Sequence, residues 1–129
     1  MTTIKRFEDI EAWKQARVVC KKIYELTLKD LFRKDYSLVD QIRRSSGSAM
    51  DNIAEGFERD GNREFIQFLN IFNGSIGETR SQLYRALDYE YINQDEFDAN
   101  YDECIKLSRQ IRGFSDYLKQ SDFKGHKFK

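Results

Sequence analysis

The titratable and nucleophilic side chains of this sequence offer few of the combinations that enzymes use. The single histidine, His126, lies close to the C-terminal end among lysines and away from any segment that could form a core. A histidine-based triad and the Glu-x-x-His pairs of di-iron bundles therefore have no candidate residues. The sequence also has no GxxxxGK or GxGxxG phosphate loop. We expect no enzyme activity, no cofactor and no metal.

Two carboxylates and two thiols remain as chemical candidates. Glu55 and Glu78 fit either a carboxylate pair for acid-base chemistry or separate partners of an arginine, for which Arg44 is the candidate. Cys20 and Cys104 stand alone, without a CxxC spacing, and are expected to be small core residues in a reducing compartment. Together with the absence of a signal-peptide pattern and of a long apolar run, this predicts a cytoplasmic protein with no membrane contact.

Basic side chains form a possible binding pattern near the start of the chain. Residues 1–34 contain nine Lys or Arg and five Asp or Glu. The bases expected on the outer side of the first helix, as candidates for nucleic-acid binding, are Lys14, Arg17, Lys21, Lys22 and Lys29. Such a face fits either contact with phosphates or an ordinary solvated surface. Over the whole chain, 22 basic and 22 acidic residues cancel, so no bulk charge favours nucleic acid.

These residues all fall in segments with a helical period. The chain has 129 residues and no proline, which suits one domain built from long helices. Apolar residues recur at three- and four-residue steps over about 8–31, 38–59, 62–91 and 93–118. We predict helix caps at Ser37, Asn62 and Asn93, and expect the helix over 62–91 to be the longest. The expected fold is all-α: an antiparallel up-down-up-down four-helix bundle spanning 1–129, with a short arm at 1–6 and a flexible basic tail at 121–129.

Apolar residues outside the predicted core favour self-association. The core face of the first helix is expected to comprise Ile10, Trp13, Ala16, Cys20, Ile23, Tyr24 and Thr27. The residues left off the core faces are Val18, Val19, Leu26, Met50, Ile66, Ile71, Tyr84 and Tyr89. A small bundle rarely leaves so many apolar groups in water, so a homo-oligomer is expected.

A polar stripe on the predicted second helix is the second candidate surface. At 100° per residue, one arc next to the apolar face contains Gln41, Arg44, Ser45, Ser48, Asn52, Glu55 and Arg59. Small residues accompany it, among them Gly47, Gly56, Gly74 and Gly77. Because glycine inside a helix costs on the order of 1 kcal/mol, we expect a close approach of backbones there. The approach is either helix packing with buried hydrogen bonds, or contact with another subunit or a nucleic acid.

A resemblance rests on the run Gln41-Ile-Arg-Arg-Ser-Ser-Gly-Ser-Ala-Met-Asp-Asn-Ile-Ala-Glu-Gly56. Phe7-Glu-Asp-Ile-Glu-Ala-Trp13 before it, and Phe68-Leu69, Gly74-Ser-Ile-Gly-Glu78 and Gln82-Leu83 after it, extend the match to about 7–118. The chain resembles a bacterial family named for proteins encoded in intervening sequences of 23S rRNA genes, also labelled S23 ribosomal protein. The resemblance implies a left-handed four-helix bundle that forms a ring-shaped homopentamer, similar to the accessory variability protein of diversity-generating retroelements. It supplies no active-site residues.

Residues and resemblance together predict a non-enzymatic oligomeric scaffold that binds RNA or a ribonucleoprotein partner. The alternative is a protein-protein interaction module that has no nucleic-acid contact. In both interpretations the polar stripe specifies structure or assembly. Its predicted members are Gln41, Arg44, Ser45, Ser48, Asn52, Glu55, Gly56, Gly74 and Glu78.

Overall fold

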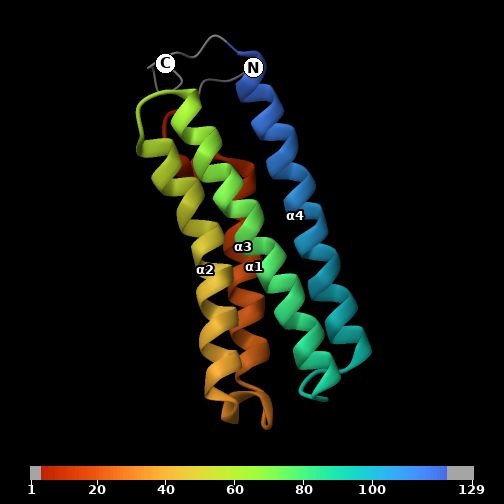
Figure 1. The fold of residues 1–129 in the computed structure, drawn as a ribbon. Coiled ribbons are helices and arrows are strands. Elements are labelled where there is room, and N and C mark those ends of the chain that lie inside the picture. Colours follow the sequence, from red (N-terminus) through yellow and green to blue (C-terminus); the bar gives the residue numbers. More distant parts are fainter. Residues whose placement is uncertain (1–3, 122–129) are drawn as a thin grey trace.

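The computed structural model describes residues 4–121 as a bundle of four long helices (Figure 1). The helices are α1 (Glu11–Thr27), α2 (Tyr36–Glu58), α3 (Asn62–Asp88) and α4 (Gln94–Gln120), with 3-10 turns η1 (Phe7–Asp9) and η2 (Phe32–Lys34) before α1 and α2. The helices pack in a square, α1 on α2, α2 on α3, α3 on α4 and α4 on α1. Figure 1 shows the α1–α2 and α3–α4 connections at one end and the α2–α3 turn at the other. The predicted antiparallel up-down-up-down topology is therefore confirmed.

One apolar core fills the space between the helices. The apolar face of α2 is buried and consists of Leu38, Ile42, Ala49, Ile53 and Phe57. Phe32, in η2, is fully buried and anchors the α1–α2 connection beneath the helices. Within residues 4–121, none of the helices combines the length and apolar character needed to cross a membrane. The predicted basic tail from 122 onward, with His126, lies outside the described residues.

The first helix is shorter than predicted, and its buried face is rotated. The prediction was 8–31, but the extended backbone of Ile10 (φ −77°, ψ 121°) separates η1 from α1, and α1 ends at Thr27. Val19 and Leu26 are buried, whereas Tyr24, predicted for the core, is 48% exposed. The Tyr24 ring lies 4.5 Å from the Arg43 guanidinium, so a cation-π contact at the surface replaces core packing.

Two of the three predicted caps are wrong. Asp35 Oδ1, rather than Ser37, accepts a hydrogen bond from Leu38 N at 3.1 Å, because α2 begins at Tyr36 and places Ser37 inside the first turn. Gly61 is the N-cap residue of α3 and has φ 96°, which side-chain-bearing residues rarely adopt. Asn62 instead donates to Leu118 O at 2.8 Å and ties the start of α3 to the end of α4.

The helix over 62–91 also ends earlier than predicted. It stops at Asp88, and Glu90 follows with φ 62°, so the chain turns before Tyr91. Because α3 and α4 each contain 27 residues, α3 is not longer than α4. The cap predicted at Asn93 is confirmed as a reciprocal capping box with Glu96.

Candidate functional site

The polar stripe on α2 divides into a buried row against α3 and an exposed row. Ser45, 5% exposed, is the centre of the buried row. Its Oγ lies 2.8 Å from Thr79 Oγ1 and donates to Gln82 Oε1 at 2.7 Å. Thr79 Oγ1 also lies 3.0 Å from Ser75 O. Each polar side chain is thus satisfied by another within the α2–α3 contact, as burial requires.

The same contact continues along α2 in both directions. Ser48 Oγ lies 3.1 Å from Ser75 Oγ, and Asn52 Nδ2 donates to Ser48 O at 2.7 Å. Toward the other end, Arg85 Nη1 donates to Gln41 Oε1 at 3.1 Å. The predicted hydrogen-bond network between the second and third helices is therefore present.

A shallow groove lies over this network on the outside of the bundle. Its volume is about 320 Å³. It is lined by Asp40, Gln41, Arg44, Ser45, Ser48, Ser75, Glu78 and Gln82. The predicted pairing of Arg44 with Glu55 or Glu78 is wrong: Arg44 pairs with Asp40, one turn earlier on α2, and Glu55 pairs with Arg59 at 2.9 Å. Both ion pairs join residues four apart on α2, because side chains at this spacing are neighbours on a helix surface.

The glycines near the stripe differ in how closely the rest of the chain approaches them. A Cβ built on Gly56 would lie 2.7 Å from Phe68 Cβ, so here α2 and α3 do approach closely. At Gly47, Gly74 and Gly77 a Cβ would meet nothing within 4 Å. The expectation of close backbone approach therefore holds at Gly56, whereas the other three glycines have no close neighbour within this chain.

The basic residues predicted on the first helix are only partly available for binding. Lys22 pairs with Glu103 of α4 at 3.3 Å, and Lys29 pairs with Glu96. Lys14 pairs with Glu11 at 3.2 Å. Arg17, whose guanidinium lies 6.0 Å from the Trp13 ring, and Lys21 are exposed and make no ion pair within residues 4–121. Lys29 lies beyond the end of α1, so the five bases do not form one helical face.

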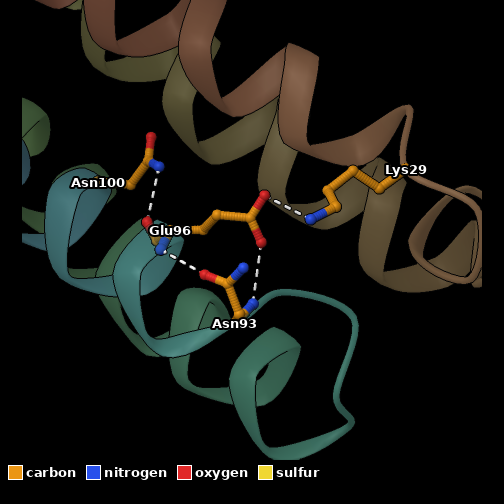
Figure 2. Close-up of polar contacts among 4 residues, drawn as sticks. All are labelled: Lys29, Asn93, Glu96 and Asn100. Carbon is orange, nitrogen blue, oxygen red and sulfur yellow. Dashed lines mark hydrogen bonds and ion pairs between the residues drawn. The ribbon is translucent and has the colours of Figure 1, made fainter.

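A tight polar cluster holds the α1–α2 and α3–α4 connections together. Figure 2 shows Glu96 at its centre, with the Lys29 ammonium on one carboxylate oxygen and Asn93 N donating to the other at 2.9 Å. Glu96 N donates in return to Asn93 Oδ1 at 2.8 Å, and Asn100 Nδ2 donates to Glu96 O at 2.8 Å. The hydrogen bond from Lys29, followed by the one from Asn93 N, lowers the pKa of Glu96. This cluster is structural.

An aromatic cluster on the α3–α4 side was missed by sequence reasoning. The Tyr84 ring lies 4.7 Å from Phe97 and 5.5 Å from Tyr101, yet Tyr84 is 48% exposed. The Arg80 guanidinium lies 5.4 Å from the Tyr101 ring and donates to its hydroxyl at 3.4 Å, which lowers the pKa of Tyr101. Arg80 Nε is buried with no hydrogen-bond partner among the described residues. The sequence contains one signal for this cluster: Arg80 and Tyr84 are four residues apart, which places them on the same side of a helix.

Both cysteines were predicted to be core residues. The prediction is confirmed for Cys104 and partly confirmed for Cys20. Cys104 is fully buried, and burial raises its pKa to about 12. Cys20 is half-buried, and burial raises its pKa as well. Because the thiolate is the reactive form, neither thiol is activated as a nucleophile.

The predicted surplus of exposed apolar residues is half right. Val19 and Leu26 are buried, and Met50 and Ile66 pack partly buried against the core. Val18, Ile71, Tyr84 and Tyr89 are between 42% and 52% exposed. The structure adds four more exposed apolar residues: Tyr24, Leu28, Leu31 and Tyr36. Several lie near the connections between helices, where sequence period carries no information.

Comparison with known proteins gives one family and one fold. Residues 8–113 match the family described as 23S rRNA-intervening sequence protein. A crystal structure of a protein with unknown function from the S23 ribosomal protein family of Bacteroides thetaiotaomicron VPI-5482 is similar, with a TM-score of 0.73 and 20% identity. The similarity covers 81% of this chain and 97% of that protein. No protein of curated function matches the chain.

Proposed function

Because the chain belongs to the family of 23S rRNA-intervening sequence proteins, we propose that it is a non-enzymatic scaffold that assembles with copies of itself and holds RNA or a ribonucleoprotein partner. The proposal needs a surface for assembly and a surface for the partner. The α2–α3 groove is the first of these surfaces.

The observation that carries the assembly proposal is the combination found in the α2–α3 groove. Its floor is uncharged and satisfied internally by Ser45, Thr79 and Gln82. Its rim carries Asp40, Arg44 and Glu78, charges of both signs that suit a polar partner surface. A rigid floor under a charged rim favours binding because little side-chain entropy is lost on contact.

Beside this groove, Gly74 is a second feature that suits assembly. It lies on the exposed side of α3, one residue before Ser75, and has open space where a side chain would be. A helical glycine costs on the order of 1 kcal/mol and receives no packing in return within one chain. A neighbouring subunit that approaches α3 at Gly74 would account for it.

Assembly into a closed ring needs a heterologous contact, in which two different faces of the chain meet. The α2–α3 groove supplies one face. The exposed apolar residues Val18 and Tyr24 of α1 lie on other sides of the bundle and are available for the second. Five copies is the number that the family resemblance implies.

Replacement of Gly74 by leucine tests the assembly proposal. The added side chain would fill the space reserved for the neighbour, so Gly74→Leu should shift the sedimentation coefficient toward that of a single chain. Gly113→Leu is the matched control, because Gly113 is also helical with open space around it, but on α4. If Gly74→Leu and Gly113→Leu assemble equally well, the α2–α3 groove is not the contact.

The partner surface is proposed for a polyanion. Arg17 and Lys21 of α1 support it, since both are exposed and unpaired in the described part of the chain. Lys14, Lys22 and Lys29 contribute less because each is neutralised by a carboxylate. Under the alternative, an interaction module that binds protein alone, reversing the bases of α1 to acids would leave capture of the partner unaffected.

A further inference from the structure

The α3–α4 side of the bundle carries four exposed bases that make no ion pair within residues 4–121, whereas α1 has two, Arg17 and Lys21. Arg109, Arg112 and Lys119 of α4 are all exposed, and Arg63 lies in the first turn of α3. None of the four makes an ion pair within residues 4–121, in contrast to Lys14, Lys22 and Lys29. We propose that this surface binds the phosphate backbone of single-stranded RNA, and that the exposed ring of Tyr84 stacks on a base.

Contacts between α3 and α4 place these bases together. Ser108 of α4 lies against Asn73 of α3, with Oγ 3.3 Å from Asn73 Oδ1. Arg112 is four residues after Ser108 and Lys119 a further seven, so both return to the same side of the helix, and Arg109 adjoins them. At the same end, the hydrogen bond from Asn62 to Leu118 O brings Arg63 beside the last turn of α4.

Little negative charge opposes them. The sequence of α3 from Phe65 to Gly77 contains no charged residue, and its polar side chains there are neutral. Among the bases themselves the acidic side chains are Glu64 and Asp116. These two acids form no ion pair in the described chain, and neither does the exposed Asp102, which lies seven residues before Arg109 on the same side of α4. The arginines therefore remain free to exchange counterions for phosphates.

The aromatic cluster lies further along the same side. Arg80 and Tyr101 are in contact across α3 and α4, and Tyr101 lies 11 residues before Arg112, about 16 Å along the helix. Tyr84 is held by Phe97 and Tyr101 yet half exposed. Phosphate-binding arginines that share a face with an exposed aromatic ring are the combination that binds single strands without sequence preference. An acidic peptide would use the arginines and leave Tyr84 without a role.

The test uses the full chain and fluorescence anisotropy of a labelled 20-nucleotide oligouridylate over a salt series. Arg63→Glu/Arg109→Glu/Arg112→Glu should lose at least tenfold in affinity and lower the magnitude of the salt slope by up to about 2, roughly 0.7 for each phosphate contact removed. The matched control, Lys5→Glu/Arg33→Glu/Lys34→Glu, makes the same charge change at exposed bases next to η1 and η2, away from α3 and α4, and should stay within about twofold. Tyr84→Leu, which keeps an apolar side chain, should lose about tenfold.

Several results would overturn the inference: no binding by the wild-type chain, a loss in the control variant as large as in the α3–α4 variant, or competition by polyglutamate as effective as by RNA. If the glutamate variant does not fold, the glutamine version of the same three substitutions replaces it, and wild-type affinity would then count against the proposal. The inference rests on the proposed function in one respect: self-assembly would set how many copies of the α3–α4 surface one particle carries. Sedimentation of the same samples separates the two, because a single chain that binds RNA here would refute assembly alone.

Discussion

Ser45 illustrates how single residues of α2 reconcile a polar sequence with a packed bundle. Its hydroxyl connects Thr79 and Gln82 of α3 through contacts of 2.8 and 2.7 Å in a buried position. We expect Ser45→Ala to lower the free energy of unfolding by about 1–3 kcal/mol, because Gln82 Oε1 would be left buried with a donor removed. Urea denaturation measures this. The exposed Ser37→Ala on the same helix should change stability by less than about 0.5 kcal/mol; equal effects would mean that the network contributes nothing.

Gly56 gives a second prediction at the residue scale. A methyl group there would lie 2.7 Å from Phe68 Cβ, which cannot move without its helix. We expect Gly56→Ala to destabilise the fold by about 1–3 kcal/mol through overpacking. Gly113→Ala, with open space around it, should stabilise by up to about 1 kcal/mol through helix propensity. Thermal melts of both variants measure the difference, and a stabilising Gly56→Ala would contradict the packing described here.

The comparison of glycines shows what residue types alone could predict. Gly47, Gly56 and Gly74 look alike in sequence, yet only Gly56 has a close neighbour. The difference depends on which residue of α3 lies opposite, and this follows from the packing of two helices rather than from either sequence. Likewise, the sequence offers several acidic residues as partners for Arg44. In the structure Arg44 pairs with Asp40, which lies one turn away on the same helix.

At the scale of elements, the apolar period predicted the helices well and their ends less well. The apolar residues of α2 and α3 recur at regular three- and four-residue steps, and Leu38, Ile42 and Leu83 among them are buried. The ends depend on which polar side chain reaches a free backbone N–H group. Asn93 has a Glu three residues later and could be recognised, whereas Asp35 competes with Ser37 in the same stretch. Break points such as Ile10 carry no local sequence signal.

The connection between α3 and α4 yields a pH prediction. The pKa of Glu96 is lowered from its usual value of 4.5 by Lys29 and by Asn93 N. A lowered pKa in the folded state means that the carboxylate stabilises the fold above pH 4.5 and that this contribution disappears as the pH falls through the folded value. Unfolding free energies measured from pH 7 to 3 should therefore fall less steeply in acid for Glu96→Gln than for the wild type.

A matched carboxylate makes this measurement specific. Glu25 is exposed on α1, and Glu25→Gln should keep the acid dependence of the wild-type chain. An unchanged acid limb in Glu96→Gln would show that the cluster in Figure 2 does not link the two connections energetically.

At the scale of the whole molecule, the sequence predicts the fold and the family. It predicts the proposed assembly and binding surfaces only in part. The bundle topology follows from four amphipathic segments with short connections. The placement of positive charge does not, because Lys22 and Glu103 are far apart in sequence and meet only when α1 packs on α4. The same packing leaves Arg109 and Arg112 without acidic partners in the described residues. A surface formed by two helices can be predicted only when the alignment of one helix along the other is known.

Self-assembly is the central claim, and sedimentation velocity of the wild-type chain at about 1 to 100 µM tests it most directly. A stable ring predicts one species at a multiple of the 15.4 kDa chain mass, five-fold for a pentamer, that persists across the dilution series. A single species of 15.4 kDa at every concentration would contradict the scaffold, because the α2–α3 groove would then have no second copy to receive.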